Sequence, residues 1–292
     1  MEDVPLLTKE TLYQLVETSN ALPKLPLNIQ NIFKLLNTPA QIYIDDIASL
    51  VEEDRELSNL LLHHLNSNVF LLYRNISDIK EAVTYLGIES VRNLLIFFIA
   101  QKFFQAADTG KATVFHMRQY WKHVLATSIA ADMICSRLGI EDHYRMFSYG
   151  LNHDIGILVM NACLPRELDE ITSKVKSGVP QIVAEKTVLG GVTHSHIGAW
   201  ICQRWNFSPE IIRVVELHHT PYLGTEDLKT LEIMYLADLI GTQYYERLLN
   251  VNSSMQINHK VLGSLGLTLE DQKEIGIALP QEVARIAKHF IL

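Results

Sequence analysis

Residues 146–160 read MFSYGLNHDIGILVM, an apolar stretch with a single histidine–aspartate pair, His153 and Asp154, in its middle. An ionised carboxylate in such surroundings is costly to bury unless a cation or hydrogen-bond donors accompany it. Residues 233–241, IMYLADLIG, place Asp238 in the same situation, with no basic residue nearby in the sequence. We therefore expect two buried acids, on two apolar helices, that need partners. A shared cation would serve both.

Helical periodicity extends outward from this stretch toward both ends of the chain. Apolar residues recur at i, i+3, i+4 and i+7 in three segments. These sets are Ile29, Ile32, Phe33 and Leu36; Ile44, Ile47, Ala48 and Val51; and Val283, Ile286, Ala287 and Phe290. Each set forms one apolar stripe on an amphipathic helix. No run of alternating strand residues and no repeat of fixed period is visible, so the sequence predicts an all-α fold.

Residues that favour helix ends support this prediction. Start signals are Asp45, Ser208 followed by Pro209, and Thr268 with Asp271 three residues later. Stop signals are Gly87, Gly139, and Gly190 with Gly191. The sequence thus predicts where several of the helices begin and end.

One joint divides the predicted helices into two groups. Residues 106–113, AADTGKAT, are small and polar and contain a glycine. They follow an apolar helix predicted over residues 90–104 and precede a long helix predicted over 116–138. We expect a front helical bundle at 1–110 packed on a multi-helix domain at 111–292, because residues 94–104 are too apolar to be exposed to water all round.

Composition excludes several classes of protein. The 292 residues carry a formal net charge of −8, so no broad basic surface is available for nucleic acid. Cys135, Cys163 and Cys202 are widely spaced without a CxxC motif, which favours reduced, buried thiols over disulfides or a zinc ribbon. The first residues lack a secretory signal, and the longest apolar run, 94–100, falls short of the roughly 20 residues of a membrane span. We expect a cytoplasmic protein.

The histidines point to where the chemistry lies. Ten of the twelve follow residue 110. The candidate ligands are His123, the pair His153 and Asp154, His194 and His196, His218 and His219, and Asp238. Imidazole nitrogens and carboxylate oxygens from several helices can bind one divalent metal in a bundle interior. The alternative is a set of separate buried polar groups satisfied by arginine, tyrosine or the backbone.

The order His, His-Asp, Asp resembles the HD superfamily of metal-dependent phosphohydrolases. Several segments resemble more specifically its HDOD (HD-related output domain) subfamily of bacterial signalling proteins. These segments are LPKLPLNIQNIFKLLNTP, ELSNLLLHHLNSNVF, ISDIKEAVTYLGIESVRNLL, WKHVLATSIAA, GLNHDIGIL, HSHIGAWICQRWNFSPEII and ELHHT, in the family's order over about residues 20–245. The last 45 residues match no motif. The resemblance implies one metal bound by His123, His153, Asp154 and Asp238.

The resemblance also bears on cofactor and partners. It implies a divalent metal (Fe, Mn, Zn or Ni), a protein partner in a signalling pathway and a nucleotide as a candidate ligand. No input domain is recognised in the chain, so the signal would arrive from another molecule. A second group, His194, His196, His218 and His219, lies next to predicted helix ends. Two interpretations stay open: the group binds a second metal or lines a ligand pocket, or its rings interact with helix dipoles or act as solvated caps.

Two departures from the HD pattern separate the candidate functions. Active HD hydrolases carry a lysine three residues after the aspartate, where this chain has Ile157, and the Gly-Tyr-Pro motif of HD-GYP phosphodiesterases is missing. Loss of that cation weakens stabilisation of a phosphoryl transition state, unless Lys122, Arg204 or Arg213 replaces it. We therefore expect a signalling output protein with little or no turnover. The alternatives are a metal-dependent phosphohydrolase acting on a nucleotide or cyclic dinucleotide, and a scaffold whose histidines bind nothing.

His63 and His64 in the front half follow a run of leucines and have no carboxylate nearby in the sequence. We expect both on a helix surface.

Overall fold

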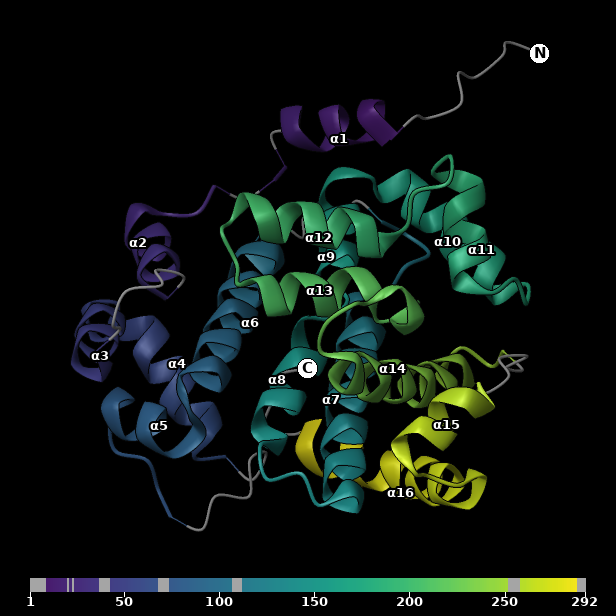
Figure 1. Ribbon diagram of the computed structural model, residues 1–292. Helices are drawn as coiled ribbons and strands as arrows, with labels where there is room; N and C mark the ends of the chain where they lie inside the picture. The colour runs from purple at the N-terminus through teal and green to yellow at the C-terminus, as the bar shows by residue number, and fades with distance from the viewer. Residues whose placement is uncertain are drawn as a thin grey trace.

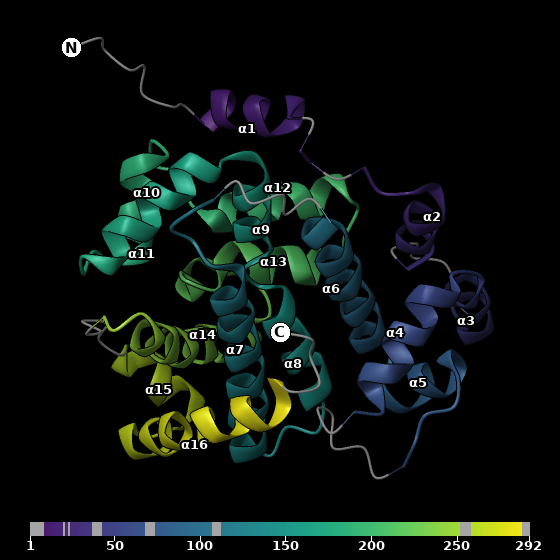
Figure 2. The same ribbon diagram turned by 180° about the vertical axis from the view of Figure 1, so that it is seen from behind.

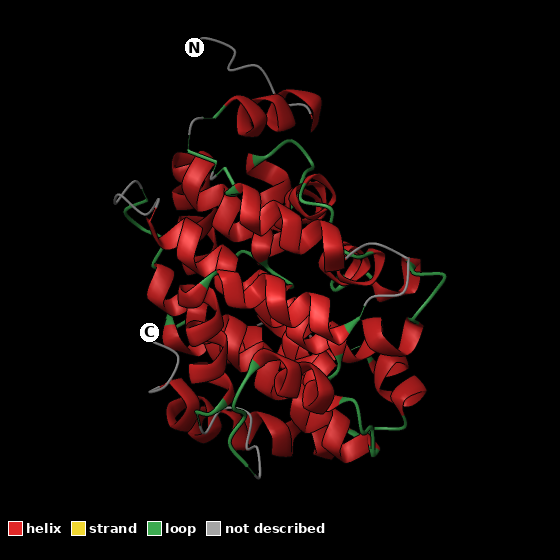
Figure 3. Ribbon diagram, turned by 90° about the vertical axis from the view of Figure 1, so that its left-hand side faces the viewer, coloured by secondary structure: helices red, strands yellow, loops and turns green. Residues whose placement is uncertain are grey.

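A computed structural model describes residues 9–19, 21–22, 24–36, 43–67, 74–106, 112–251 and 258–287. Within them the protein consists of helices and contains no strand (Figure 3). The helices are α1 Lys9–Thr18, α2 Leu27–Leu36, α3 Ile44–Glu53, α4 Arg55–Leu65, α5 Ile79–Leu86, α6 Ile88–Ala106, α7 Met117–Leu138, α8 His143–Asn152, α9 Ile155–Cys163, α10 Pro165–Lys176, α11 Gln181–Val188, α12 His194–Arg204, α13 Pro209–Leu217, the 3-10 helix η1 Pro221–Leu223, α14 Leu228–Leu248, α15 His259–Leu265 and α16 Leu269–Ala287. The predicted all-α fold is confirmed.

Helix α6 joins the front helices to the rest of the molecule. Every residue from 91 to 100 is buried, which explains why residues 94–100 are apolar without a break instead of on one face. It packs against α4 and α5 on one side and against α8 and α9 on the other (Figures 1 and 2). The front bundle therefore packs on the back domain, as predicted. The division at residue 110 stays a prediction, since residues 107–111 lie outside the described ranges.

Helix α7 is the centre of the back domain and positions the site. Helices α8, α14 and α16 all pack against it (Figure 1). It begins after His116 and ends at Gly139, whose φ of 64° is left-handed. Glycine adopts this conformation without steric cost, and it is a common way to end a helix. Helices α9, α12 and α13 pack together beside α7 and α8, and α10 and α11 lie at their edge.

Most of the predicted helix boundaries agree with the structure. Pro209 is the first residue of α13, after Ser208, and Thr268 exchanges hydrogen bonds with Asp271 at the start of α16. The start predicted at Asp45 is two residues late, because the N-cap of α3 is Tyr43 and Asp45 lies inside its first turn. There the carboxylate favours the positive end of the helix dipole. Phe290 lies outside the described residues.

The prediction for the front histidines is wrong for His64. His63 is exposed, but His64 is buried in α4 with its ring stacked on Phe98 of α6, 4.5 Å between ring centres. Burial, with His63 beside it, lowers the pKa of His64 to about 4, so the ring is neutral at pH 7. A neutral imidazole can pack as an aromatic ring, which sequence spacing alone does not reveal.

The cysteines and the hydropathy of the helices bear on two expectations from composition. Cys135 and Cys202 are buried, Cys163 is partly so, and all three are free thiols. In this part of the chain, no helix combines the length and hydropathy needed to cross a bilayer.

Candidate metal centre

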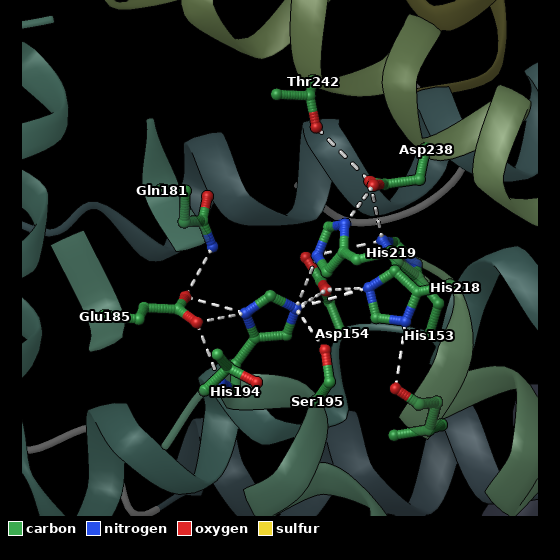
Figure 4. A network of polar contacts seen from close by, with 12 residues as sticks. His153, Asp154, Gln181, Glu185, His194, Ser195, His218, His219, Asp238 and Thr242 are labelled. Carbon is green, nitrogen blue, oxygen red and sulfur yellow. Dashed lines mark hydrogen bonds and ion pairs between the residues drawn. The ribbon is translucent and has the colours of Figure 1, made fainter. Parts of the chain in front are cut away.

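Seven histidine and aspartate side chains converge in the back domain. They are His123 in the middle of α7, His153 and Asp154 between α8 and α9, His194 at the first residue of α12, His218 and His219 directly after α13, and Asp238 in α14. All but His219 are buried, and Figure 4 shows six of them pointing toward one another. Five of the seven lie at helix ends, where the chain turns and can direct a side chain inward.

The first cluster consists of His123, His153 and Asp238. The Nε2 atoms of the two histidines are 3.3 Å apart, and Asp238 Oδ1 is 3.4 Å from each. Asp154 Oδ2 lies 3.1 Å from Nε2 of His123 and 3.4 Å from Nε2 of His153. The structure thus brings together the four residues that the resemblance assigns to one metal.

The second cluster contains His194, His218 and His219. Nε2 of His194 lies 3.3 Å from Nε2 of His218 and 3.1 Å from Nε2 of His219. The other carboxylate oxygen of Asp154, Oδ1, is 3.0 Å from Nε2 of His194 and 3.5 Å from Nε2 of His218. Asp154 therefore faces both clusters, one oxygen to each, while Asp238 Oδ2 approaches Nδ1 of His219 at 3.2 Å.

These spacings fit two metal ions. Ligand atoms about 2.0–2.2 Å from an ion lie about 3.0 Å apart at neighbouring octahedral positions and about 3.4 Å apart at tetrahedral ones. The distances within the clusters fall between 3.0 and 3.5 Å. Nitrogen lone pairs repel at 3.1–3.3 Å unless a proton or a cation lies between them. Imidazole and carboxylate together are the ligands that iron, manganese, zinc and nickel accept.

Hydrogen bonds orient three of the imidazole rings toward the centre. Nδ1 of His153 is 2.7 Å from the carbonyl oxygen of Gly150, and Nδ1 of His218 is 3.0 Å from that of Val215. A carbonyl can only accept, so each Nδ1 carries the proton and each Nε2 presents a lone pair to the cluster. Nδ1 of His194 donates to Glu185 instead, 2.7 Å away. This arrangement is typical of metal-ligating histidines.

Glu185 is a further candidate residue of the centre, which the sequence did not predict. It is fully buried on α11 and accepts hydrogen bonds from the His194 ring, from the His194 backbone N–H at 2.9 Å and from Gln181 Nε2 at 3.0 Å (Figure 4). Its position nine residues before His194, in a short helix, carries no recognisable signature.

Three buried carboxylates, those of Asp154, Asp238 and Glu185, lie in or against the centre. Burial opposes ionisation of Asp154, but His153 and His194 outweigh it and hold the pKa of Asp154 well below its usual range. The pKa of Asp238 is likewise low, mainly because His219 and His123 overcome its burial. Among the described residues, the ion pairs of Asp154 and Asp238 are formed with histidines and not with lysine or arginine. Protons on the imidazoles or metal ions must supply the balancing charge.

The pKa values of His123 and His218 are shifted in opposite directions. Burial would lower the pKa of His123, but the hydrogen bonds that its ring donates to Asp154 and Asp238 raise it to about 10. Burial and the neighbouring His219 lower the pKa of His218 to about 3, which leaves this ring neutral. A neutral imidazole is the form that binds a metal.

The close approach of α9 and α12 brings Asp154 to His194. Gly156, the second residue of α9, faces the first turns of α12. A Cβ at this position would overlap the carbonyl oxygen of His194 and lie 2.8 Å from the backbone nitrogen of Gly198. The two backbones can pack at this distance only because Gly156 has no side chain.

A family model described as "HDOD domain" matches residues 22–221, more than half of the chain. The chain belongs to the HDOD family. An uncharacterised protein of Treponema pallidum (strain Nichols) is 28% identical over 215 residues, which are 72% of this chain but 40% of that protein. This HDOD chain therefore spans less than half of the length of that relative.

Solved structures share the fold over nearly the whole HDOD chain. An HDOD domain protein of unknown function from Geobacter sulfurreducens is 23% identical, with a TM-score of 0.70 and coverage of 97% of this chain and 99% of that one. A Shewanella amazonensis protein described provisionally as a phosphohydrolase is 21% identical, with a TM-score of 0.67 and coverage of 95% and 97%. A Marinobacter aquaeolei protein described provisionally as a signal transduction protein is 19% identical, with a TM-score of 0.71 and coverage of 96% and 64%. At these identities the likeness establishes the fold alone.

His196 does not join the other histidines of the HDOD centre. Its Nδ1 accepts a hydrogen bond from the backbone N–H of Thr193 at 3.1 Å and lies 2.9 Å from the Thr193 hydroxyl, so it caps the start of α12. Successive helical residues are rotated by about 100°. His194 and His196 therefore cannot both face the centre from the same turn.

The cations that could replace the missing lysine are placed elsewhere. Arg204 pairs with Glu17 at 2.6 Å, and Arg213 pairs with Asp227 at 2.6 Å. Lys122 directly precedes His123 in α7, so its side chain leaves the helix about 100° away from that of His123. Ile157 itself is buried one turn after Asp154 in α9.

Proposed function

We propose that this HDOD chain is a signal-transduction output domain built around a centre for two divalent metals, with little or no phosphodiester turnover. The observation that carries the proposal is the contrast at Asp154. Each of its carboxylate oxygens faces a cluster of three further candidate ligands, whereas the residue one turn along α9 is the buried, apolar Ile157. Candidate metal ligands thus surround Asp154, whereas the cation that would meet a phosphate is absent from that position.

Contacts between the centre and the front bundle support a signalling role. Asn152, directly before His153, donates from Nδ2 to the backbone carbonyl of Asn93 in α6 at 2.9 Å. Asn93 in turn donates from its own Nδ2 to the hydroxyl of Ser148 in α8 at 3.1 Å. All three side chains are buried, where hydrogen bonds have precise geometry and are costly to break. A shift of His153 on metal loss would therefore move the adjacent Asn152 and, through its hydrogen bond, α6. The partner that reads this state is proposed to be a protein.

One experiment tests the lack of turnover. Protein loaded with Mn²⁺, Fe²⁺ or Zn²⁺ is assayed for metal per chain and for hydrolysis of bis(p-nitrophenyl) phosphate and cyclic di-GMP. We expect two ions per chain and rates far below the 1–10³ s⁻¹ that enzymes ordinarily reach.

The alternative is a metal-dependent phosphohydrolase, favoured by the two-ion geometry, since paired metals commonly activate water and clamp phosphoryl oxygens. Turnover at ordinary enzyme rates that requires the loaded metal would establish the alternative. A chain that retains no metal under any loading condition would contradict both.

A second experiment tests transmission to the front bundle by amide hydrogen exchange. Removing metal with a chelator is expected to speed exchange within α6 as well as around the centre, because the Asn152 and Asn93 contacts connect the two. In Asn152→Leu, which keeps the volume but removes the donor, metal content should persist while the α6 response shrinks. Changes confined to residues 117–251 in the unsubstituted protein would contradict transmission by this route.

A further inference from the structure

A pocket opens directly onto the proposed metal centre. It encloses about 430 Å³, including its mouth, and His123 and Asp154 form part of its wall. The rest of the wall comes from α7, α9, α10, α11 and α14 and from Phe115, which precedes α7. A ligand bound in this pocket would touch the centre at one end.

The wall of this pocket is mainly apolar. Ile157 lies in it, together with Leu168, Ile171 and Val175 of α10. The residue that replaces the lysine of active HD hydrolases thus faces the space that a ligand would fill. No lysine or arginine belongs to the described lining.

The polar groups of the wall are largely engaged with the protein. The Tyr120 hydroxyl donates to the backbone carbonyl of Asp154 at 3.1 Å, the Thr172 hydroxyl to that of Leu168 at 2.7 Å, and Gln181 Nε2 to Glu185. Burial raises the pKa of Tyr245 to about 12, so its phenol is neutral at pH 7. A ligand therefore meets few donors and no positive charge away from the metals.

A charged group buried in such a wall would lose its hydration without gaining a partner. We propose that the pocket binds a small molecule with an uncharged apolar body and one oxygen-containing group that reaches the metals, a short-chain monocarboxylate being the representative class. The preference excludes nucleotides and cyclic dinucleotides, whose remaining phosphates would face Ile157 and the α10 side chains. The inference rests on the proposed function, since the oxygen group needs the metals as its partner.

Calorimetric titration of the metal-loaded chain tests the preference with three acids of equal length. Hexanoate has an apolar tail, adipate ends in a second carboxylate, and 6-aminohexanoate ends in an ammonium group. We expect hexanoate to bind at least tenfold more tightly than either of the others. Equal or tighter binding of adipate, or tighter binding of phenyl phosphate or cyclic di-GMP, would overturn the inference.

Metal content measured on the same samples separates the two proposals. A metal-free protein contradicts the proposed function, whereas a metal-loaded protein without the hexanoate preference contradicts the pocket assignment alone.

A matched pair of substitutions locates the binding site. Val175→Phe fills the pocket from α10, and Val183→Phe makes the same change at a position of α11 that is 52% exposed. We expect hexanoate affinity to fall at least tenfold in Val175→Phe, with metal content retained, and to be unchanged in Val183→Phe. Undiminished binding by a folded, metal-loaded Val175→Phe would place the ligand elsewhere and refute the site. The acid series on the unsubstituted chain decides the preference independently of either variant.

Discussion

Replacement of Gly156 by alanine is expected to destabilise the protein by about 3 kcal/mol and to lower its metal content. The added methyl group would overlap the carbonyl oxygen of His194, a backbone atom that cannot rotate away. Helices α9 and α12 must then separate, and overpacking of this kind commonly costs about 1–3 kcal/mol, with backbone clashes at the upper end. The same separation moves His194 away from Asp154, so the second cluster is expected to lose its ion first.

Gly276→Ala is the matched control for this substitution. Gly276 also lies within a helix, α16, but an added Cβ there meets no atom within 4 Å. Alanine is favoured over glycine at open helix positions by about 0.5–1 kcal/mol, so this variant is expected to be slightly more stable. Urea unfolding and metal analysis of both variants check the prediction. A Gly156→Ala protein with unchanged stability and metal content would show that α9 and α12 do not depend on this close approach.

The helices and the approximate location of the centre could be predicted from the sequence because both depend on local signals. Apolar spacing and capping residues act within a few positions of one another, and an acid such as Asp238 in an apolar helix indicates a buried partner wherever that partner lies. The resemblance to HDOD proteins then selected four ligands that the structure brings together.

What could not be predicted depends on contacts between distant segments. Nothing in the sequence around Glu185 shows that its carboxylate meets the His194 ring, because the turn between α11 and α12 determines that contact. The bridging position of Asp154 depends on the approach of α12 to α9, and so on Gly156. His64 was misplaced since a histidine after a leucine run can face either way. His196 is different, because helical geometry alone separates it from His194.

Asp154→Ala is expected to have the largest effect of any single substitution in the centre, the loss of both ions. Its Oδ2 faces His123 and His153, and its Oδ1 faces His194 and His218, so one residue completes both clusters. Each ion bound at 1,000 times its Kd stabilises the folded state by about 4 kcal/mol. Loss of both would remove about 8 kcal/mol, a fall in Tm of roughly 16–32 °C, since 1 kcal/mol corresponds to roughly 2–4 °C in chains of 150–250 residues.

The number of ions that variants of the other candidate ligands bind distinguishes a residue that serves both clusters from one that serves a single cluster. His153→Ala and His218→Ala each remove a ligand from one cluster only, and each is expected to leave about one ion per chain and an intermediate Tm. Asp132→Ala is the control, because it removes a partly exposed carboxylate of α7 that pairs with His143 outside the centre, and it should keep both ions. Metal analysis and thermal unfolding of the folded variants give the comparison. If Asp154→Ala retained one ion per chain, Asp154 would belong to a single cluster, and the two sites would bind their metals independently.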